Sequence, residues 1–280
     1  MSEEQARPWA RPLTQVLELE PDGADRFTTR LDGFGAITLG CATLAAALTT
    51  ERALHALHAW FLRPAPTDRP VEVLVERVRD GRRFSQRRVA MQSGGQRVCE
   101  VLASFATAAS GLDAQDVRLD PDTPPPEALP SEQEIARLEG WDLAGPGPLG
   151  GPLEWRWVGG SPWRPPEPGA SSRYGAWVRP RFPLPAARAW HAAALAFLTD
   201  YHSHMSVARW LRAFTAPVGY TSLDQALWVH RDLAWDDWWH LTTEGVAAYA
   251  GRALTRRSLH TRDGRLVASM AQEQLIPSLP

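Results

Sequence analysis

The stretch RRFSQRRVAMQSGGQRVCEVLASF, from Arg82 to Phe105, has a counterpart near the end of the chain, GRALTRRSLHTRDGRLVASMAQE, from Gly251 to Glu273. Further upstream, HAWFLRP at His58–Pro64 is similar to ALWVHRD at Ala226–Asp232. Two matches in the same order indicate a duplicated unit, which is the equivalent of a homodimer within one chain. The first match keeps one constant offset, which aligns Arg87-Arg88 with Arg256-Arg257, Gly95 with Gly264 and Val98 with Val267.

Each unit is predicted to be a helix followed by several strands. Gly35–Leu48 and Ala186–Thr199 are apolar and rich in alanine, which favours helix. Segments such as Val71–Val78, Arg87–Met91 and Val98–Phe105 mix branched and polar residues in the manner of strands. Glycines in SGGQ and RDGR supply the hairpin turns. We therefore expect an α+β fold with two helix-plus-antiparallel-sheet repeats joined into one continuous sheet.

A proline-rich connector is predicted between the repeats. Half of the 24 prolines lie between Pro121 and Pro168, and proline disfavours regular elements because its φ is fixed and it has no N–H. We expect an N-terminal repeat over 1–112, a connector over 113–169 and a C-terminal repeat over 170–280. Only one short helix, near Ser131–Leu138, is expected inside the connector. A connector this long is expected to pack over the surface or near the site.

The composition excludes several classes of function. A formal net charge of -2 argues against a nucleic-acid partner, which needs a clustered positive charge. All 30 basic residues are arginine, so Schiff-base and P-loop lysines are excluded. Cys41 and Cys99 lie in no CxxC and near no histidine cluster, so neither a zinc site nor a disulfide framework is expected. We expect no metal and no cofactor.

The sequence also predicts a soluble, cytoplasmic protein with no membrane partner. The first residues, MSEEQARPWARP, lack the basic and apolar regions of a signal peptide. The longest apolar run, Ile37–Leu48, is too short to cross a bilayer.

The chain resembles the acyl-CoA thioesterase II family, whose fold is a double hotdog. The resemblance rests on both repeats and covers most of the chain except the connector. Each stretch alone is a weak signal, and the set is specific: GFGAITLG, LHALHAWFLRP, RRFSQRRVAMQSGG, SLDQALWVHR and DGRLVASMAQE, together with the AWVRPRFPL and TDYHSH region. The resemblance implies hydrolysis of acyl-CoA by water, without a metal or a covalent acyl-enzyme.

The family's catalytic Asp, Thr and Gln positions fall on Asp200, Ser222 and Gln272. A carboxylate can take a proton from water, and a hydroxyl and an amide can hold the water or the carboxylate in place. For the oxyanion and the substrate we expect backbone N–H groups near Gly35 and Ala36 at the start of the first helix, together with His58. No GxSxG motif is present, which excludes the serine-nucleophile type of thioesterase.

Several alternatives stay open at the level of the sequence. Asp200 at a helix end is also a common capping residue. The paired arginines Arg87, Arg88, Arg256 and Arg257 are candidates for contacts with the CoA phosphates, and exposed arginine pairs are more often simply solvated. Ala36 replaces the second of two glycines typical of the family, which favours a non-catalytic acyl-thioester binding protein as the alternative function. A hydratase or dehydratase would need an Asp–His pair that we do not find.

The repeat alignment predicts one hydrolytic site per chain. At the offset of each match, Gln272 aligns with Ala103 and Ser222 aligns with Leu54, so the first repeat lacks both polar groups. We expect the first repeat to serve binding and pairing. From the family we also expect further association of the chains, as a dimer of double hotdogs.

Overall fold

The structure is a computed structural model that describes residues 11–140, 151–161, 164, 171–211 and 220–276. Most of the segment on which the signal-peptide prediction rests, and part of the predicted connector, lie outside the described residues. The helices are α1 (Leu13–Val16), α2 (Gly35–Ala47), η1 (Pro126–Ala128), α3 (Glu132–Glu139), α4 (Arg188–Asp200) and α5 (Met205–Leu211). The strands are β1 (Glu20–Pro21), β2 (Arg26–Thr29), β3 (Ala53–Phe61), β4 (Val71–Asp80), β5 (Phe84–Ser93), β6 (Gln96–Ala106), β7 (Leu153–Val158), β8 (Tyr174–Pro180), β9 (Thr221–Ser222), β10 (Asp224–Val229), β11 (Trp239–Tyr249), β12 (Arg252–Thr261) and β13 (Leu266–Leu275).

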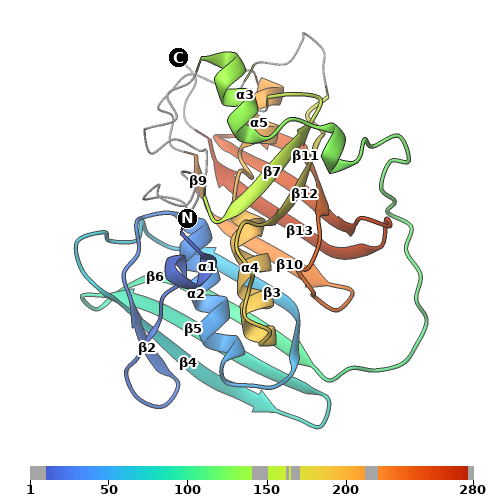
Figure 1. Cartoon of the computed structure of the whole chain (residues 1–280). Coiled ribbons are helices and arrows are strands. Elements are labelled where there is room, and N and C mark those ends of the chain that lie inside the picture. The colour runs from blue at the N-terminus through green and yellow to red at the C-terminus, as the bar shows by residue number, and fades with distance from the viewer. Residues whose placement is uncertain (1–10, 141–150, 162–163, 165–170, 212–219, 277–280) are drawn as a thin grey trace.

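The described strands form one antiparallel sheet whose order mirrors itself about its centre (Figure 1). From the middle outward, one half runs β3, β6, β5, β4, β2 and the other runs β10, β13, β12, β11, β8. The two halves meet where β3 pairs with β10, and β1 and β7 extend the two outer edges. The predicted duplication and the single continuous sheet are therefore confirmed.

An approximate two-fold axis passes through the β3–β10 pair. His58 lies opposite Ala226, which is the residue that the sequence match aligns with it. In an antiparallel pair of equivalent strands, a residue faces its own equivalent only at the symmetry axis. Leu57 and Leu227 next to this position are fully buried, so the join between the repeats is part of the apolar core.

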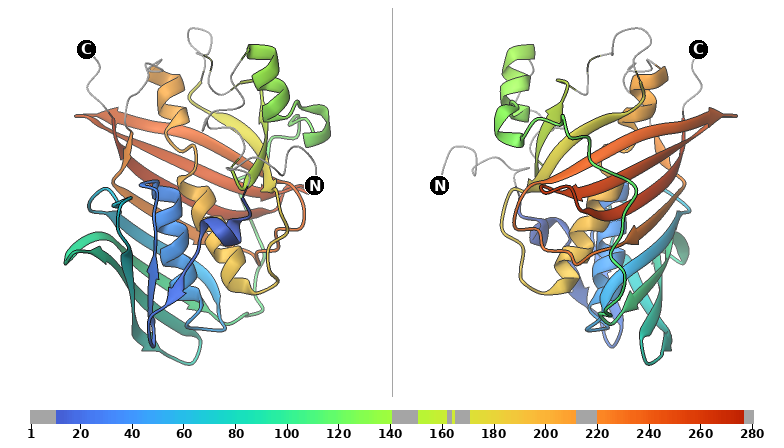
Figure 2. Two further views of the ribbon diagram at one scale, coloured as in Figure 1. Left: turned by 60° about the vertical axis from the view of Figure 1, so that its left-hand side comes forward. Right: turned by 90° about the vertical axis from the view of Figure 1, so that its right-hand side faces the viewer.

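Helices α2 and α4 pack side by side against one face of the sheet (Figure 2). Residues 36–47 of α2 are all buried, and residues 192–200 of α4 are buried as well. Both helices are rich in alanine, a strong helix former whose small side chain lets two helices approach each other closely. The start of α2 lies beside the end of α4, where a Cβ on Gly35 would touch the Asp200 carboxylate. The two helices therefore run antiparallel, as two-fold symmetry requires.

The predicted hairpin turns are confirmed. Gly95 between β5 and β6 has φ +76°, and Gly264 between β12 and β13 has φ +83°. Glycine tolerates this left-handed backbone because it has no Cβ. Each of the two hairpins also contains a register shift, near Met91 and near Leu259.

The first part of the connector, up to residue 126, runs over the face of the sheet opposite to the helices (Figure 2). Gln115 bonds to the backbone of the β12–β13 hairpin, and Trp177 on β8 donates to Pro124 O at 2.8 Å. Helix α3 lies where a short helix is predicted, and its first turn is capped by Ser131 and Glu134. The expectation of no other regular element is wrong for 153–158, because β7 pairs along β8 there. Its alternating Leu153, Trp155 and Trp157 side chains are buried, which offsets the effect of the surrounding prolines.

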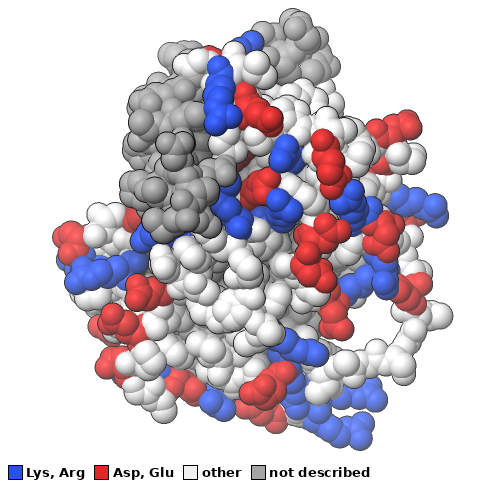
Figure 3. Space-filling model, in the orientation of Figure 1, with Lys and Arg blue, Asp and Glu red and all other residues white. Residues whose placement is uncertain are grey.

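No helix among the described residues is long and apolar enough to span a membrane. On the face drawn in Figure 3, positive and negative side chains are interspersed, with an uncharged area between them.

Candidate active site

Asp200 is the last residue of α4, and its carboxylate points into the protein. The side chain is only 5 % exposed. The helix ends because the next residue, Tyr201, adopts an extended conformation with ψ 128°. Asp200 at this position caps no N–H at a helix start, so the ordinary capping role of aspartate does not explain it.

Ser222 and Gln272 both bond to the same carboxylate oxygen. Ser222 Oγ donates to Asp200 Oδ1 at 2.6 Å, and Gln272 Nε2 also donates to Oδ1. Gln272 Nε2 lies 2.9 Å from Ser222 Oγ, which closes a ring of three groups. The three residues predicted from the sequence are therefore in direct contact, although 72 positions separate the first from the last.

The sheet brings these groups together from separate strands. Gln272 lies in the middle of β13, on the buried face opposite Thr255. Ser222 lies on β9, which pairs with the end of β13 through Gln274. Because alternate residues of a strand share a face, Gln272 and Gln274 both point toward the helices.

Burial raises the pKa of Asp200, and its polar neighbours act against this shift. Desolvation is the largest effect, and the hydrogen bonds from Ser222 and Gln272 lower the pKa, as does the positive charge of Arg257. A carboxylate with a raised pKa is a stronger base than an exposed aspartate. This is the electrostatic state that a general base requires.

The second oxygen of Asp200 faces the start of α2. A Cβ built on Gly35 would lie 2.6 Å from Asp200 Oδ2, so only glycine fits this approach without a shift. Among the described residues no group donates a hydrogen bond to Oδ2. The first backbone bond of α2 is from Thr38 N to Phe34 O, which leaves the N–H groups of Gly35 and Ala36 without a helical partner. Asp200 and Gly35 thus both line the space between them.

That space is a cavity of about 320 Å³. It is lined by Asp200, Ser222 and Gly35, by the end of β3 and the residues that follow it (61–65), and by the segment 220–223. Ala36 is fully buried and does not line the cavity, so its methyl group does not narrow it. The substitution of a family glycine by Ala36 therefore does not favour a non-catalytic protein.

Ser203 and Gln274 also belong to the site, and the sequence did not predict them. Gln274 Nε2 donates to Ser203 Oγ at 2.8 Å and to Gln272 Oε1 at 3.2 Å, so it fixes the amide of Gln272. Both residues line the cavity, as does His204, whose ring stacks on Tyr220 at 5.1 Å. The spacing contains a signal for both: Gln274 follows Gln272 by two on one strand, and Ser203 follows Asp200 by about one helical turn.

Other predicted residues lie elsewhere. His58 is exposed on the outer face of β3, where it packs edge-on against Trp228, so it does not fit a role in substrate binding. Arg88 and Arg256 are exposed on the sheet and pair with Glu100 and Glu244.

Arg87 and Arg257 are turned into the protein, 1 % and 4 % exposed. Arg87 bonds to the hydroxyl and carbonyl of Thr49, just after α2. Arg257 donates to the carbonyls of Leu198, Thr199 and Tyr201 at the end of α4. Buried guanidinium groups with these partners cannot reach a phosphate, so this placement does not fit a contact with CoA. Instead, each of the two arginines braces the end of a central helix.

The arrangement supports attack of water on a carbonyl. One carboxylate oxygen is held by two donors, the other faces an open cavity, and free backbone N–H groups lie next to it. Such N–H groups can stabilise the negative charge that develops on a carbonyl oxygen. The described residues contain no group of histidine, cysteine or acidic side chains suited to hold a metal ion.

Comparison with known proteins identifies the family. Residues 26–107 match the acyl-CoA thioesterase N-terminal domain, and residues 121–276 match the acyl-CoA thioesterase C-terminal domain. The chain belongs to the acyl-CoA thioesterase family. As a member of this family it is a hydrolase that acts on the thioester of acyl-CoA.

Similar proteins carry the same description. A solved acyl-CoA thioesterase II, TesB2 from Mycobacterium marinum, is 31% identical with a TM-score of 0.78, and the match covers 95% of this chain and 98% of that one. Human acyl-coenzyme A thioesterase 8 is 29% identical over 287 residues, 96% of this chain and 89% of its own length. Acyl-CoA thioesterase 2 of Haemophilus influenzae is 26% identical over 241 residues, 81% of this chain and 80% of its own length. The resemblance and the double-hotdog fold predicted from the sequence are confirmed.

Proposed function

We propose that this thioesterase hydrolyses fatty acyl-CoA by direct attack of a water molecule that Asp200 activates. The observation that carries the proposal is the bonded group of Asp200, Ser222 and Gln272, of which Asp200 and Ser222 line a cavity. Ser222 and Gln272 hold Oδ1, which leaves Oδ2 to accept a proton from the water. The water oxygen then attacks the carbonyl carbon of the thioester.

The oxyanion forms next to the start of α2. Its negative charge is stabilised by the N–H group of Gly35, which lines the cavity and is fixed in direction by the helix before the substrate arrives. The expected contribution of Ala36 does not fit, because Ala36 does not line the cavity. The tetrahedral intermediate then collapses, the carbon–sulfur bond breaks, and the thiolate of CoA leaves. The thiolate takes up the proton that Asp200 received, which restores the carboxylate and releases a free fatty acid.

Replacing Asp200 by asparagine tests the proposal. Asparagine keeps the shape and can still accept bonds from Ser222 and Gln272, but it cannot take a proton. We expect turnover in a thiol-release assay to fall by about 10²- to 10⁴-fold, with an unchanged circular dichroism spectrum. Unchanged turnover in a folded variant would exclude Asp200 as the base.

The same assay distinguishes the proposed hydrolase from the alternative function, a non-catalytic acyl-thioester binding protein. That function predicts acyl-CoA binding without thiol release above background at any chain length. The division into repeats 1–112 and 170–280 with a connector over 113–169, the cytoplasmic location and the homo-oligomeric state all stay predictions.

A further inference from the structure

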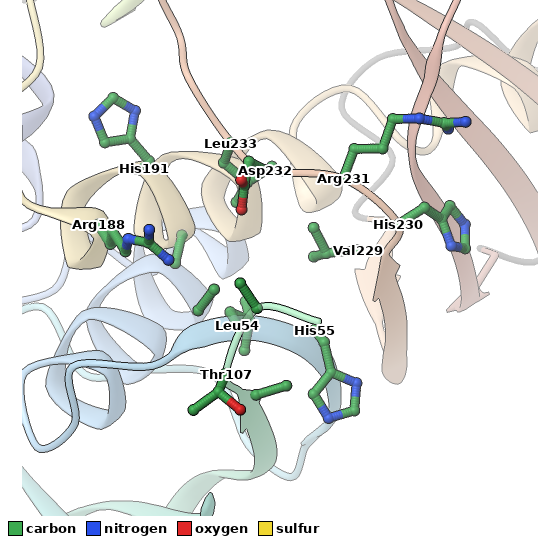
Figure 4. Close-up of a pocket in the computed structure, with 14 residues that line it drawn as sticks. Leu54, His55, Thr107, Arg188, His191, Val229, His230, Arg231, Asp232 and Leu233 are labelled. Atoms are coloured by element: carbon green, nitrogen blue, oxygen red, sulfur yellow. The ribbon is translucent and has the colours of Figure 1, made fainter. Parts of the chain in front are cut away.

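A second cavity, also of about 320 Å³, lies at the opposite ends of the two central helices. We call it the distal cavity. It is lined by the first turn of α4, by 53–55 at the start of β3, by 106–108 after β6 and by 229–233 after β10 (Figure 4). None of the groups assigned above to hydrolysis lines it.

The distal cavity is the two-fold counterpart of the active-site cavity. The active-site cavity has the start of α2, the end of β3 and the segment before β10 in its wall. The distal cavity has the start of α4, the end of β10 and the start of β3. These are the same three places in the other repeat. The duplication has therefore kept both cavities, at equal volume.

The chemistry of the two cavities differs. Helices α2 and α4 each have 13 residues, and superposing their first residues aligns Gly35 with Arg188 and Asp200 with Ala47. The base is thus replaced by a methyl group, and the glycine that faces it is replaced by an arginine. Leu54 stands where the sequence match has Ser222. The distal cavity has exchanged its hydrolytic groups for a cation and an apolar wall.

Arg188 is available to a ligand. It is exposed, and no described residue forms an ion pair or a hydrogen bond with its guanidinium. Figure 4 shows Arg188 and Asp232 on one side of the distal cavity and Leu54 and Thr107 on the other. Arg231 differs, because its guanidinium is directed away and bonds to Asp113.

Asp232 is the one carboxylate that lines the distal cavity. It is exposed and lies beyond ion-pair distance of any described cation. The three histidines of the lining, His55, His191 and His230, have pKa values lowered by burial, so they are neutral near pH 7. Arg188 is therefore the unpaired positive group, and Asp232 is the group that opposes an anion.

We propose that the distal cavity binds the carboxylate form of a fatty acid. The carboxylate accepts bonds from the Arg188 guanidinium, whose forked donors match its two oxygens. The alkyl chain lies on Leu54, Ala192, Val229 and Leu233. The inference rests on the proposed function in one respect, since the free acid is the product of that reaction. The distal cavity then senses product without hydrolysing substrate.

Photolabelling with an octanoic acid that carries an alkyl diazirine tests the proposal. Labelled peptides are mapped by mass spectrometry, and the peptide with Val229–Leu233 reports the distal cavity. The peptide with Tyr220–Leu223 reports the active site and serves as an internal reference. We expect saturable labelling of both in the full chain.

Two substitutions with opposite expected effects on binding test whether Arg188 recognises the carboxylate of the fatty acid. Arg188→Gln removes a charge-assisted bond, so half-saturation of the distal cavity should need about tenfold more ligand. Asp232→Asn removes the opposing charge and should lower the concentration needed. The matched control is Arg30→Gln, which removes the same charge from an exposed arginine that does not line the distal cavity. The diazirine alcohol of equal length should not respond to Arg188→Gln.

The proposal is overturned if the distal cavity is not labelled when the active site is saturated. It is also overturned if Arg188→Gln leaves the half-saturating concentration of the acid unchanged. Equal responses of the acid and the alcohol to Arg188→Gln would overturn it as well, because the ligand would then be bound by the apolar wall alone. Labelling does not depend on turnover, so an absence of thiol release would contradict the proposed function and leave this result intact.

Discussion

At the scale of single residues, the active site depends on the close approach of Gly35 to the Asp200 carboxylate. Gly35 has no side chain where Asp200 Oδ2 comes nearest to α2, and a Cβ there would lie 2.6 Å from that oxygen. A larger residue at either position would require the other to shift, because the carboxylate and the glycine share one small space. This contact was not visible in the sequence, where the two residues lie far apart.

Gly35→Ala should therefore reduce activity more than stability. The added methyl group displaces the carboxylate or shifts the first turn of α2, so we expect kcat/KM to fall by about tenfold or more, as misplacement near a reacting centre does. Gly40→Ala is the matched control, since it adds the same methyl group to the same helix. Its nearest contact is the buried side chain of Leu17, which does not line the active-site cavity, so its kinetics should stay near those of the natural chain. Equal losses in the two variants would contradict the role of Gly35.

The pH dependence of the reaction reports the pKa of Asp200. The base must be ionised, so kcat/KM should rise with pH through a pKa that burial has raised above the ordinary value of 3.8. The hydrogen bond from Ser222 stabilises the ionised form of Asp200 and lowers its pKa. Ser222→Ala removes this bond and should therefore raise the pKa of Asp200. The acid limb of the profile should therefore move to higher pH in this variant. A limb that stays in place or moves to lower pH would contradict the assignment of Asp200 as the base.

At the scale of elements, each repeat uses a buried arginine to bind the carbonyls at the end of a central helix. Arg87 and Arg257 come from corresponding strands, β5 and β12, and each is buried against the end of one of the two central helices. The carbonyls at a helix end lack helical partners, and a cation there also interacts favourably with the helix dipole. Only Arg257 braces a helix that ends in the proposed base.

Helix α3 of the connector is anchored by a buried acid. Glu132 is 1 % exposed and accepts a hydrogen bond from Trp157 Nε1 at 3.3 Å. Burial raises the pKa of Glu132 from 4.5 to about 8. Between these two values the folded protein keeps a proton that the unfolded chain releases, so the free energy of unfolding falls as the pH rises. Below pH 4.5 the full stabilisation is present, and above about pH 8 it is lost.

Glu132→Gln should remove this pH dependence, because glutamine stays neutral. We expect urea unfolding between pH 5.5 and 8.5 to show a decline on the order of 1 kcal/mol per pH unit in the natural chain, and a smaller slope in the variant. Glu134→Gln is the control in the same helix. The pKa of Glu134 is lowered by its bonds to Ser131, so its titration lies below this window and the slope should persist. A slope unchanged in Glu132→Gln would assign the dependence to another group.

At the scale of the whole molecule, two-fold symmetry holds in the backbone and fails in the side chains. The mirrored strand order and the facing of His58 and Ala226 keep the geometry of a dimer. The polar groups of the site lie in one half only, since Ala103 aligns with Gln272 and Leu54 with Ser222. Fusion into one chain allows the halves to diverge in this way, which identical subunits cannot do.

The chain should therefore have one hydrolytic site. With a thioester analogue whose acid is released slowly, we expect a burst of one thiol per chain in rapid-mixing experiments. Asp200→Asn should abolish the burst. A burst of two thiols per chain would mean that the distal cavity hydrolyses as well, which would contradict the loss of its base.

The sequence by itself determined the duplication, the two central helices, the short helix of the connector, the strands of the repeated segments and the three polar groups of the site. The duplication and its elements follow from local patterns: alanine-rich apolar runs, alternation with period two, and matched motifs at constant offset. The three polar groups follow from the resemblance to the family. Strand β7 was missed because its apolar alternation is short and lies among prolines, whose local effect the pairing with β8 overrides.

Tertiary structure alone decided which way the side chains face and which distant groups meet. The arginine pairs show this, because one member of each pair is buried at a helix end and the other lies in solvent. The sequence shows that neighbours on a strand point to opposite faces, but not which face the helices cover. The contact of Gly35 with Asp200 likewise exists only because two helices, far apart in the chain, pack antiparallel on one sheet.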